Sequence, residues 1–235
     1  MRPKPPPLPK TSRAERPPMT KTIVHLMRHG EVHNPEGVLY GRLPGYVLSE
    51  LGHKMAERVA EWVVDNKLDV TYLVASPLER AQQTATPTSK ALGLEIHTDP
   101  RVIEAGNQFE GKTFGVGDGA LKHPQNWWRL RNPFSPSWGE PYIEIAARMR
   151  LAVKDAREAA RGHEAIIVSH QLPVWTARLD IEQRRFFHDP RKRECSLASL
   201  TSITFEDDQV VSVLYREPAG DLIPEALRKK FVGGA

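Results

Sequence analysis

Three short apolar runs, each followed at once by polar side chains, constrain the fold of this chain more than any other feature. They cover residues 22–28, 70–76 and 164–170 and read TIVHLMR, VTYLVAS and EAIIVSH. Short apolar runs bounded by polar groups are typical of buried strands. Segments with apolar residues at helical spacing, 49–66 and 141–160, separate these runs. Strands that alternate with helices favour an α/β fold with a largely parallel sheet and helices on both of its faces.

Weaker patterns complete the expected set of elements. Ser49 suits the N-cap of the first helical segment, and Pro77 suits the first turn of another helix. A short strand is expected at 94–98. Residues 197–217 form two period-2 runs around the sequence EDDQ, which predicts a hairpin that adds edge strands to the sheet.

The length of the chain, 235 residues, allows one large α/β domain or two small ones. We expect a single domain over 21–235. Residues 1–20 are rich in proline and basic side chains, which predicts a disordered or polyproline II segment. Met19 is then an alternative start of the natural protein, with the preceding residues a translated leader.

The sequence favours a soluble protein of a reducing compartment. Its composition, 40% hydrophobic and 26% charged, is ordinary for such proteins. No stretch of about 18 uncharged apolar residues occurs, so we expect no membrane-spanning segment. The first residues lack the apolar region of a secretory signal. The one cysteine, Cys195, excludes an intramolecular disulfide and fits a cytoplasmic location.

Residues 111–139 interrupt the alternation of strands and helices. The segment is rich in glycine, proline and aromatic residues and contains Trp127, Trp128 and Trp138. An insertion of this kind beside an α/β sheet is a candidate lid over a site. The alternative is that the tryptophans only anchor a long loop, and the sequence leaves both interpretations open.

The basic balance of the chain, +4 with a sequence pI near 9.2, fits an anionic small substrate or nucleic acid. No zinc-finger, RNP-like or helix-turn-helix pattern accompanies the charge, so we do not expect nucleic acid to be a partner. The basic run at 184–193, RRFFHDPRKR, is predicted to be a solvated face.

The run HLMRHGEVHN at 25–34 first suggests a metal site, because His29 and His33 are four residues apart. A glycine follows the first histidine, however, so the run is not the H-E-x-x-H of zinc proteases. His29-Gly30-Glu31 matches half of the zinc deaminase signature, but the other half needs two cysteines. We therefore expect no metal and no other cofactor.

Six polar residues lie at or just beyond the carboxyl ends of the expected strands. They are Arg28, His29, Ser76, Arg80, Ser169 and His170. Ligands of open α/β sheets bind outside the carboxyl ends of the strands, so these side chains are expected to converge. Two guanidinium groups match the oxygens of a tetrahedral dianion, and a histidine held between them can attack phosphorus.

The ordered motifs RHGE, SPLERAQQT, a glutamate about twenty residues later, and VSH after a late strand resemble the histidine phosphatase superfamily, also called phosphoglycerate mutase-like. The resemblance runs from about Ile23 to Arg216. It implies a three-layer α/β/α sandwich and a phosphohistidine intermediate formed without metal. It also implies a small phosphorylated substrate.

The resemblance assigns a role to each matching residue. His29 would be the nucleophile, and Arg28, Arg80 and His170 would bind the phosphoryl oxygens. Glu104 would protonate the leaving alcohol and then activate water. We expect the two arginines to lower the pKa of His29, and burial or a bound dianion to raise the pKa of Glu104.

Other residues carry weaker assignments. Asn34 and Arg42 are expected to contact substrate, although one residue fewer than usual separates Asn34 from the nucleophile. AGNQ follows Glu104 where many relatives have an aromatic residue and a glycine, so Glu110 is an alternative acid. His25 is predicted to be structural or solvent-facing, and Cys195 is not expected to act as a nucleophile.

Three functions fit these residues. The first is a phosphatase of small phosphorylated metabolites, favoured because the stretch between acid and second histidine is modest and no tryptophan precedes Asn34. The second is a phosphoglycerate mutase-type phosphoryl transfer. The third is a non-catalytic phosphate-binding module. The oligomeric state cannot be deduced from these patterns.

Overall fold

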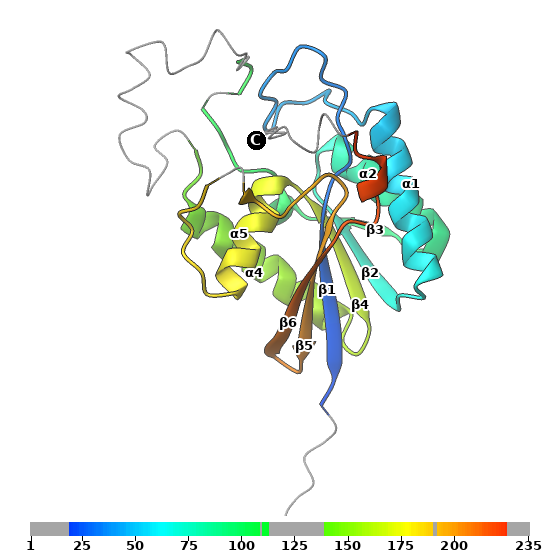
Figure 1. The fold of residues 1–235 in the computed structure, drawn as a ribbon. Helices are drawn as coiled ribbons and strands as arrows, with labels where there is room; N and C mark the ends of the chain where they lie inside the picture. The colour runs from blue at the N-terminus through cyan, green and yellow to red at the C-terminus, as the bar shows by residue number, and fades with distance from the viewer. Residues whose placement is uncertain (1–18, 109, 113–138, 190–191, 225–235) are drawn as a thin grey trace, which may run out of the picture.

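The structure, a computed structural model, describes residues 19–108, 110–112, 139–189 and 192–224. The expectations for residues 1–18 and for most of the insertion at 111–139 therefore lie outside the described residues. The central feature is a six-stranded sheet in the order β3-β2-β4-β1-β5-β6 (Figure 1). The strands are β1 (Lys21–Arg28), β2 (Val70–Ala75), β3 (Ile96–Thr98), β4 (Glu164–Ser169), β5 (Leu200–Glu206) and β6 (Gln209–Arg216).

The pairing of the strands agrees with a mostly parallel sheet. Strands β1, β2, β3 and β4 pair in parallel, whereas β5 runs antiparallel to β1 and β6 antiparallel to β5. The predicted hairpin at 197–217 is confirmed as β5 and β6. Of these two strands only β6 lies at an edge of the sheet, because β5 lies between β1 and β6.

Helices cover both faces of the sheet (Figure 1). They are α1 (Glu50–Asp65), α2 (Glu79–Leu92), α4 (Tyr142–Ala159) and α5 (Gln171–Ile181), with short 3-10 turns η1 (Pro100–Val102) and η5 (Gly220–Leu222). One apolar cluster joins the sheet to α4 and α5, and a second joins its other face to α1 and α2. The three-layer α/β/α fold predicted from the resemblance is confirmed.

The strands supply both clusters because their side chains alternate between the two faces of the sheet. In β1, Val24 and Leu26 enter the cluster under α4 and α5, whereas Met27 enters the cluster under α1. Five of the eight β1 residues form a continuous buried run, as expected of a central strand covered on both faces.

The start of α1 confirms the predicted cap. The Ser49 side chain accepts a hydrogen bond from the backbone N–H of Gly52. This helix end packs closely on the turn after β1, since a Cβ on Gly30 would lie 2.6 Å from the carbonyl oxygen of Gly52. Glycine at both positions lets α1 approach the end of β1, where His29 lies.

Two helices differ from the sequence-based prediction. Helix α2 begins at Glu79 rather than at Pro77. Helix α5 follows β4 directly, with His170 as its N-cap residue, and was not predicted. Eight of its eleven residues are buried, so it lacks the polar face that identifies a surface helix. In the described part of the chain, every helix is too short or too polar to cross a bilayer.

Candidate active site

The carboxyl ends of β1 and β4 bring two histidines together. These neighbouring parallel strands are in register with Arg28 opposite Ser169, so the next residue of each chain segment, His29 or His170, leaves the sheet at the same edge. The two imidazole rings lie 5.1 Å apart between centroids and are inclined by 59°. The convergence predicted from the three apolar runs is therefore present for both histidines.

His29 is held in one tautomer by its neighbour. Its Nδ1 lies 2.7 Å from the carbonyl oxygen of Gly30, so Nδ1 carries a proton and donates it, leaving Nε2 with a lone pair. The side chain is almost wholly buried. Burial lowers the pKa of His29 well below its ordinary value, and the charges of Arg80 and Arg28 lower it further. The predicted direction is confirmed, although burial contributes more than the arginines.

Arg80, in the first turn of α2, has no solvent-exposed surface. Its Nη2 donates to the carbonyl oxygen of Gly41 at 2.6 Å, and its guanidinium carbon lies 4.8 Å from the ring centroid of Tyr40. Its Nε and Nη1 have no hydrogen-bond partner among the described residues. Buried guanidinium N–H groups are costly to leave unpaired, and these two donors are suited to bind an anion.

Arg28, the last residue of β1, is anchored from the other end of the chain. Its Nη1 donates to the carbonyl oxygen of Cys195 at 2.9 Å. Burial raises the pKa of the Cys195 thiol to about 11, so the thiol is protonated at neutral pH. This agrees with the expectation that Cys195 is not a nucleophile, and the residue contributes its backbone to the site instead.

His170 contacts a serine from the neighbouring strand end. Its Nε2 lies 2.7 Å from Oγ of Ser76, and its buried Nδ1 has no partner among the described residues. If the serine hydroxyl donates to Nε2, then Nδ1 carries the proton and is free to donate to a ligand oxygen. Burial, then the charges of His29 and Arg80, lower the pKa of His170 well below its ordinary value.

Glu104 is buried beside these basic groups, with 2% of its surface exposed. Its Oε1 accepts a hydrogen bond from the backbone N–H of Ala105 at 2.8 Å. Burial raises the pKa of the carboxyl group, and this effect exceeds the lowering by the Ala105 hydrogen bond and by Arg80. A carboxyl group with a raised pKa suits a proton donor, as the sequence analysis expected.

Two arginines fix the backbone that carries Glu104. Arg42 donates through Nε to the Glu104 carbonyl oxygen at 2.7 Å, and Arg148 donates through Nη1 to the carbonyl oxygen of Ile103 at 2.7 Å. Both guanidinium groups also contact the carboxylate of Glu140. This clamp stabilises the position of the buried carboxyl group without touching it.

The structure gives the weaker candidates other partners. Arg42 lies next to Glu104, but two of its nitrogens are engaged by Glu104 and Glu140. Both carboxamide atoms of Asn34 bind the backbone of Val38. Glu110 packs against Gly41, whose carbonyl oxygen Arg80 binds. Substrate contact by Asn34 and Arg42 stays a prediction, and so does the choice of Glu104 over Glu110.

Three residues near the site were not assigned a role from the sequence. Ser76 was recognised only as a polar strand end, and Tyr40 was not singled out. Arg193 belongs to the basic run at 184–193, which was predicted to be solvated. That prediction is wrong at Arg193, which is partly buried and donates to Gln171 and His188. A run of charges alone cannot show which member turns inward.

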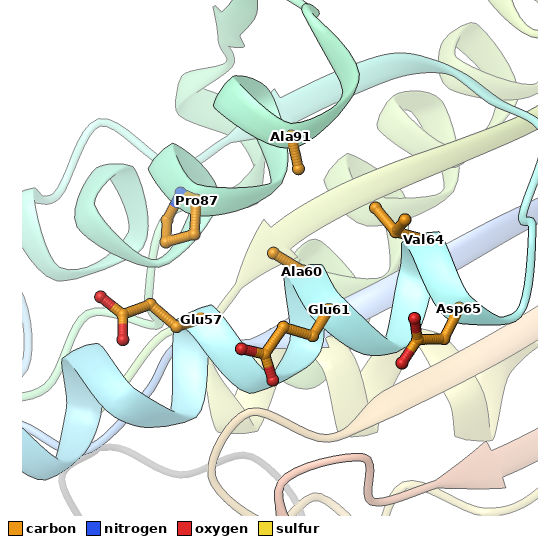
Figure 2. Close-up of a pocket in the computed structure, with 7 residues that line it drawn as sticks. All are labelled: Glu57, Ala60, Glu61, Val64, Asp65, Pro87 and Ala91. Atoms are coloured by element: carbon orange, nitrogen blue, oxygen red, sulfur yellow. The ribbon is translucent and has the colours of Figure 1, made fainter.

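A surface groove elsewhere on the molecule has the opposite electrostatic character (Figure 2). It lies between α1 and α2, and three acidic side chains of α1 line it: Glu57, Glu61 and Asp65. Carboxylates repel a phosphorylated ligand, so this groove is not a phosphate site. Among the residues that the structure describes, no three His, Cys, Asp or Glu side chains are grouped closely enough to hold a metal ion.

The chain matches the family model described as histidine phosphatase superfamily (branch 1) over residues 24–218. It is 54% identical over 199 residues to a protein of Mycobacterium tuberculosis described as uncharacterized protein Rv0525, covering 85% of this chain and 98% of that protein. It is 28% identical to a probable phosphoglycerate mutase GpmB of Escherichia fergusonii, over 85% of this chain and 93% of that protein.

A further relative is phosphoserine phosphatase 1 of Hydrogenobacter thermophilus, 29% identical over 80% of this chain and 88% of that protein. Among solved structures, Bacillus stearothermophilus YhfR superposes with a TM-score of 0.66 at 24% identity. The match covers 82% of this chain and 96% of that one. The similarity to YhfR concerns the fold.

Proposed function

The chain belongs to the histidine phosphatase superfamily, branch 1, and from this premise we propose that it hydrolyses small phosphorylated metabolites as a metal-independent phosphomonoesterase with a phosphohistidine intermediate. One observation carries the proposal. His29 is buried, its Nδ1 proton is donated to the Gly30 carbonyl, and its Nε2 is therefore a lone-pair donor among arginines. An imidazole that is neutral and fixed in this tautomer is suited to attack phosphorus.

In the first step, the Nε2 lone pair of His29 forms a bond to phosphorus while the bond from phosphorus to the ester oxygen breaks. The leaving oxygen takes a proton from the carboxyl group of Glu104, whose pKa burial raises. The unpartnered donors of Arg80 and His170 would bind the phosphoryl oxygens as their charge redistributes. The products are an alcohol and phosphorylated His29.

In the second step, water gives a proton to the Glu104 carboxylate and attacks phosphorus from the side that the alcohol has left. The bond from phosphorus to Nε2 breaks, the electron pair returns to the imidazole, and inorganic phosphate is released. The cycle restores neutral His29 and protonated Glu104, so it needs no cofactor to balance protons or electrons.

Hydrolysis is proposed over mutase-type transfer because the stretch between Glu104 and His170 is modest and no tryptophan precedes Asn34. A mutase must exclude water and return the phosphoryl group to a reoriented intermediate. The relative named as a probable phosphoglycerate mutase makes this alternative the one to test first. It predicts activity that depends on a bisphosphoglycerate primer.

The test is hydrolysis of para-nitrophenyl phosphate in a non-phosphate buffer, with and without a strong chelator. We expect turnover that chelation leaves unchanged within about twofold, because no step uses a metal. Rapid acid-free quenching with a ³²P-labelled substrate should trap label on the protein, and the label should be stable in alkali and lost in acid.

Each alternative predicts a different result. Turnover that chelation abolishes would contradict the histidine route. Phosphoglycerate isomerisation that requires a bisphosphoglycerate primer, with hydrolysis far slower, would identify a mutase. Binding of inorganic phosphate without turnover of any ester in a phosphometabolite panel would identify a non-catalytic module.

A further inference from the structure

Arg193 is a partly buried cation whose hydrogen-bond partners among the described residues are neutral groups. Its Nε donates to Nε2 of His188 at 2.8 Å, and its Nη1 donates to Oε1 of Gln171 at 3.3 Å. Within the described ranges, no carboxylate lies within ion-pair distance of its guanidinium group. Removing a charge from water without an opposite charge is unfavourable, so this arrangement needs an explanation.

Other arginines of comparable burial do not share this feature. Arg148, Arg157 and Arg178 each keep less than a fifth of the side chain exposed, and each lies within 3.0 Å of at least one carboxylate oxygen. Their partners are Glu140, Glu158, Asp208, Glu182 and Glu194. The fold therefore neutralises these three arginines, whereas Arg193, like Arg80 of the candidate active site, has no carboxylate partner among the described residues.

Arg193 lies beside the candidate active site. Gln171, which it contacts, directly follows His170, and the carbonyl oxygen of Cys195, two residues after Arg193, binds Arg28. Burial lowers the pKa of Arg193, while the nearby charge of Glu104 raises it and that of Arg28 lowers it. Arg193 thus lies next to the segments that carry His170 and Arg28, and its charge interacts with that of Glu104, the proposed proton donor, on whose side of the site the alcohol leaves.

The side chain of Arg193 is held in place before any ligand binds. Nδ1 of His188 donates to the carbonyl oxygen of Phe186, so Nε2 is the acceptor for Arg193. Burial lowers the pKa of His188, which keeps that acceptor neutral. The rings of Trp175 and Tyr142 pack on the His188 ring at 5.7 and 6.0 Å between centroids. An arginine held by a histidine that is itself packed between aromatic rings loses little entropy when it binds an anion.

We propose that Arg193 is a specificity-determining residue that binds a second anionic group, a carboxylate or a further phosphate, on the alcohol part of the substrate. The inference rests on the proposed function for the identity of the first group, the transferred phosphoryl. Arg28, Arg80 and His170 serve that group, and Arg193 serves the part of the substrate that leaves. Substrates with two separated negative charges are then preferred over esters of neutral alcohols.

The test measures binding rather than turnover, so that it does not depend on catalysis. Three benzylphosphonates that differ only at the para position serve as probes: a carboxylate, its neutral carboxamide and a phosphonomethyl group. Calorimetry with the full chain should give about 10- to 100-fold tighter binding of at least one doubly anionic probe than of the carboxamide, the range for a charge-assisted hydrogen-bond pair. Comparison of carboxylate with phosphonomethyl identifies which anion Arg193 selects.

Arg193→Met should reduce that preference to less than about threefold while the carboxamide binds as before, and Arg193→Lys should retain part of the preference. Lys192→Met is the matched control, because it removes the same charge from an exposed neighbour and should leave the preference intact. Thermal unfolding of each variant identifies loss of fold.

Two results would overturn the inference. One is equal affinity for the charged and neutral probes in the unsubstituted protein, which no folding defect can explain. The other is a preference that persists in folded Arg193→Met. Failure of the proposed function is distinguishable from either, because it would leave phosphonate binding and its selectivity intact while no phosphomonoester is hydrolysed.

Discussion

His25 and His29 are four residues apart on the same segment and are 3% and 2% exposed, yet their surroundings differ completely. Within the sheet, both ring nitrogens of His25 have side-chain partners, Ser202 at 2.8 Å and Glu164 at 2.7 Å. Beyond the sheet, His29 uses Nδ1 on its own neighbour and keeps Nε2 for a ligand. Of the two expectations for His25, the structural role is right and the solvent-facing one is wrong.

The difference separates two uses of buried polar groups. In the middle of the sheet, both ring nitrogens of His25 are paired with side chains, and the result is a fixed structural residue. At the carboxyl edge, Arg80 and His170 hold buried donors without described partners, which costs stability unless a ligand completes the pairing. Burial alone therefore does not distinguish a structural histidine from a functional one, whereas unpaired ring nitrogens do.

The largest expected effect comes from replacing each of the two histidines, His29 and His25, by alanine. His29→Ala should lower phosphomonoester hydrolysis by about 1,000-fold or more, because it removes the proposed nucleophile. It should not destabilise the fold appreciably, since one local hydrogen bond is lost. His25→Ala should instead reduce the free energy of unfolding by about 2 to 3 kcal/mol, because Glu164 and Ser202 lose their partner.

Both variants are measured by para-nitrophenyl phosphate turnover and by urea unfolding at one pH and temperature. Folded His25→Ala should keep its kcat/KM within about threefold of the unsubstituted value, because the ring does not reach the site. A His25→Ala protein that is stable and inactive would reverse the comparison. So would a His29→Ala protein that retains its activity.

Much of the fold could be predicted from local patterns. The central strands β1, β2 and β4 are apolar runs with polar ends. Helix α1 has apolar residues at helical spacing and the N-cap residue Ser49, and both features can be recognised in the sequence. Helix α5 could not be found this way, because burial on nearly all sides removes the periodic contrast between faces. The order β3-β2-β4-β1-β5-β6 depends on contacts between distant segments, which local patterns do not encode.

The residues of the candidate site also fall into two groups, those that the sequence predicts and those that only the fold reveals. Arg28, His29 and His170 follow from the rule that ligands bind at the carboxyl ends of strands, and Arg80 from a motif of known spacing. The contacts of Arg193 and Ser76 are not visible in local sequence. Arg193 binds Gln171, 22 positions away, and Ser76 binds His170, 94 positions away. Nothing in the run RRFFHDPRKR shows that its last arginine turns inward, since its partners His188 and Gln171 are brought to it by the fold.

The second prediction concerns Glu104, the buried carboxyl group of the candidate active site. Glu104→Gln should lower kcat for alkyl phosphates by about 100-fold or more, because the leaving alcohol then lacks its proton donor. The loss should be smaller for para-nitrophenyl phosphate, whose leaving group needs little protonation. Activity of the unsubstituted enzyme on alkyl esters should fall as pH rises through the raised pKa of Glu104, and this limb should disappear in the variant.

Rates compared across a series of leaving groups provide the measurement. Equal losses for alkyl and aryl esters would show that Glu104 acts on both steps or on structure rather than as the acid. Glu110→Gln is the matched control, since Glu110 is the alternative acid from the sequence. If the leaving-group dependence belongs to Glu110→Gln, the assignment of Glu104 is wrong.

A smaller effect is expected for replacement of Ser76, which pairs with one ring nitrogen of His170 while the other has no described partner. Its hydroxyl occupies Nε2 of His170 and so determines which nitrogen faces the ligand. Ser76→Ala should reduce kcat/KM about tenfold by releasing the ring from this tautomer and orientation. Ser76→Thr keeps the hydroxyl and is the control, and steady-state kinetics with one aryl phosphate is the measurement. No change in Ser76→Ala would show that other contacts orient His170.

The smallest effect is on stability as a function of pH, and it tests the comparison without any substrate. Burial first, then neighbouring charges, lowers the pKa of His29 and His170 in the folded protein below the value of about 6.5 for an unfolded chain. The folded state therefore binds fewer protons than the unfolded state in that window. The contribution of each neutral histidine to stability is complete above about pH 6.5 and is lost as the pH falls towards the lowered pKa.

Replacing both His29 and His170 with asparagine should flatten the fall in unfolding free energy between about pH 7.5 and 5.5, by on the order of 1 kcal/mol per histidine. Glu104 titrates in the opposite sense, because its pKa is raised, but it is present in both proteins and cancels in the difference. Urea unfolding in buffers without phosphate or sulfate makes the measurement, since a bound anion would stabilise the charged ring. Replacement of the exposed His33 by asparagine is the control for removing a histidine from the surface. If the unfolding free energy changes with pH equally in the double variant and in the unsubstituted protein, burial does not disfavour protonation of His29 and His170. The energetic difference between these two histidines and the fully paired His25 would then be absent.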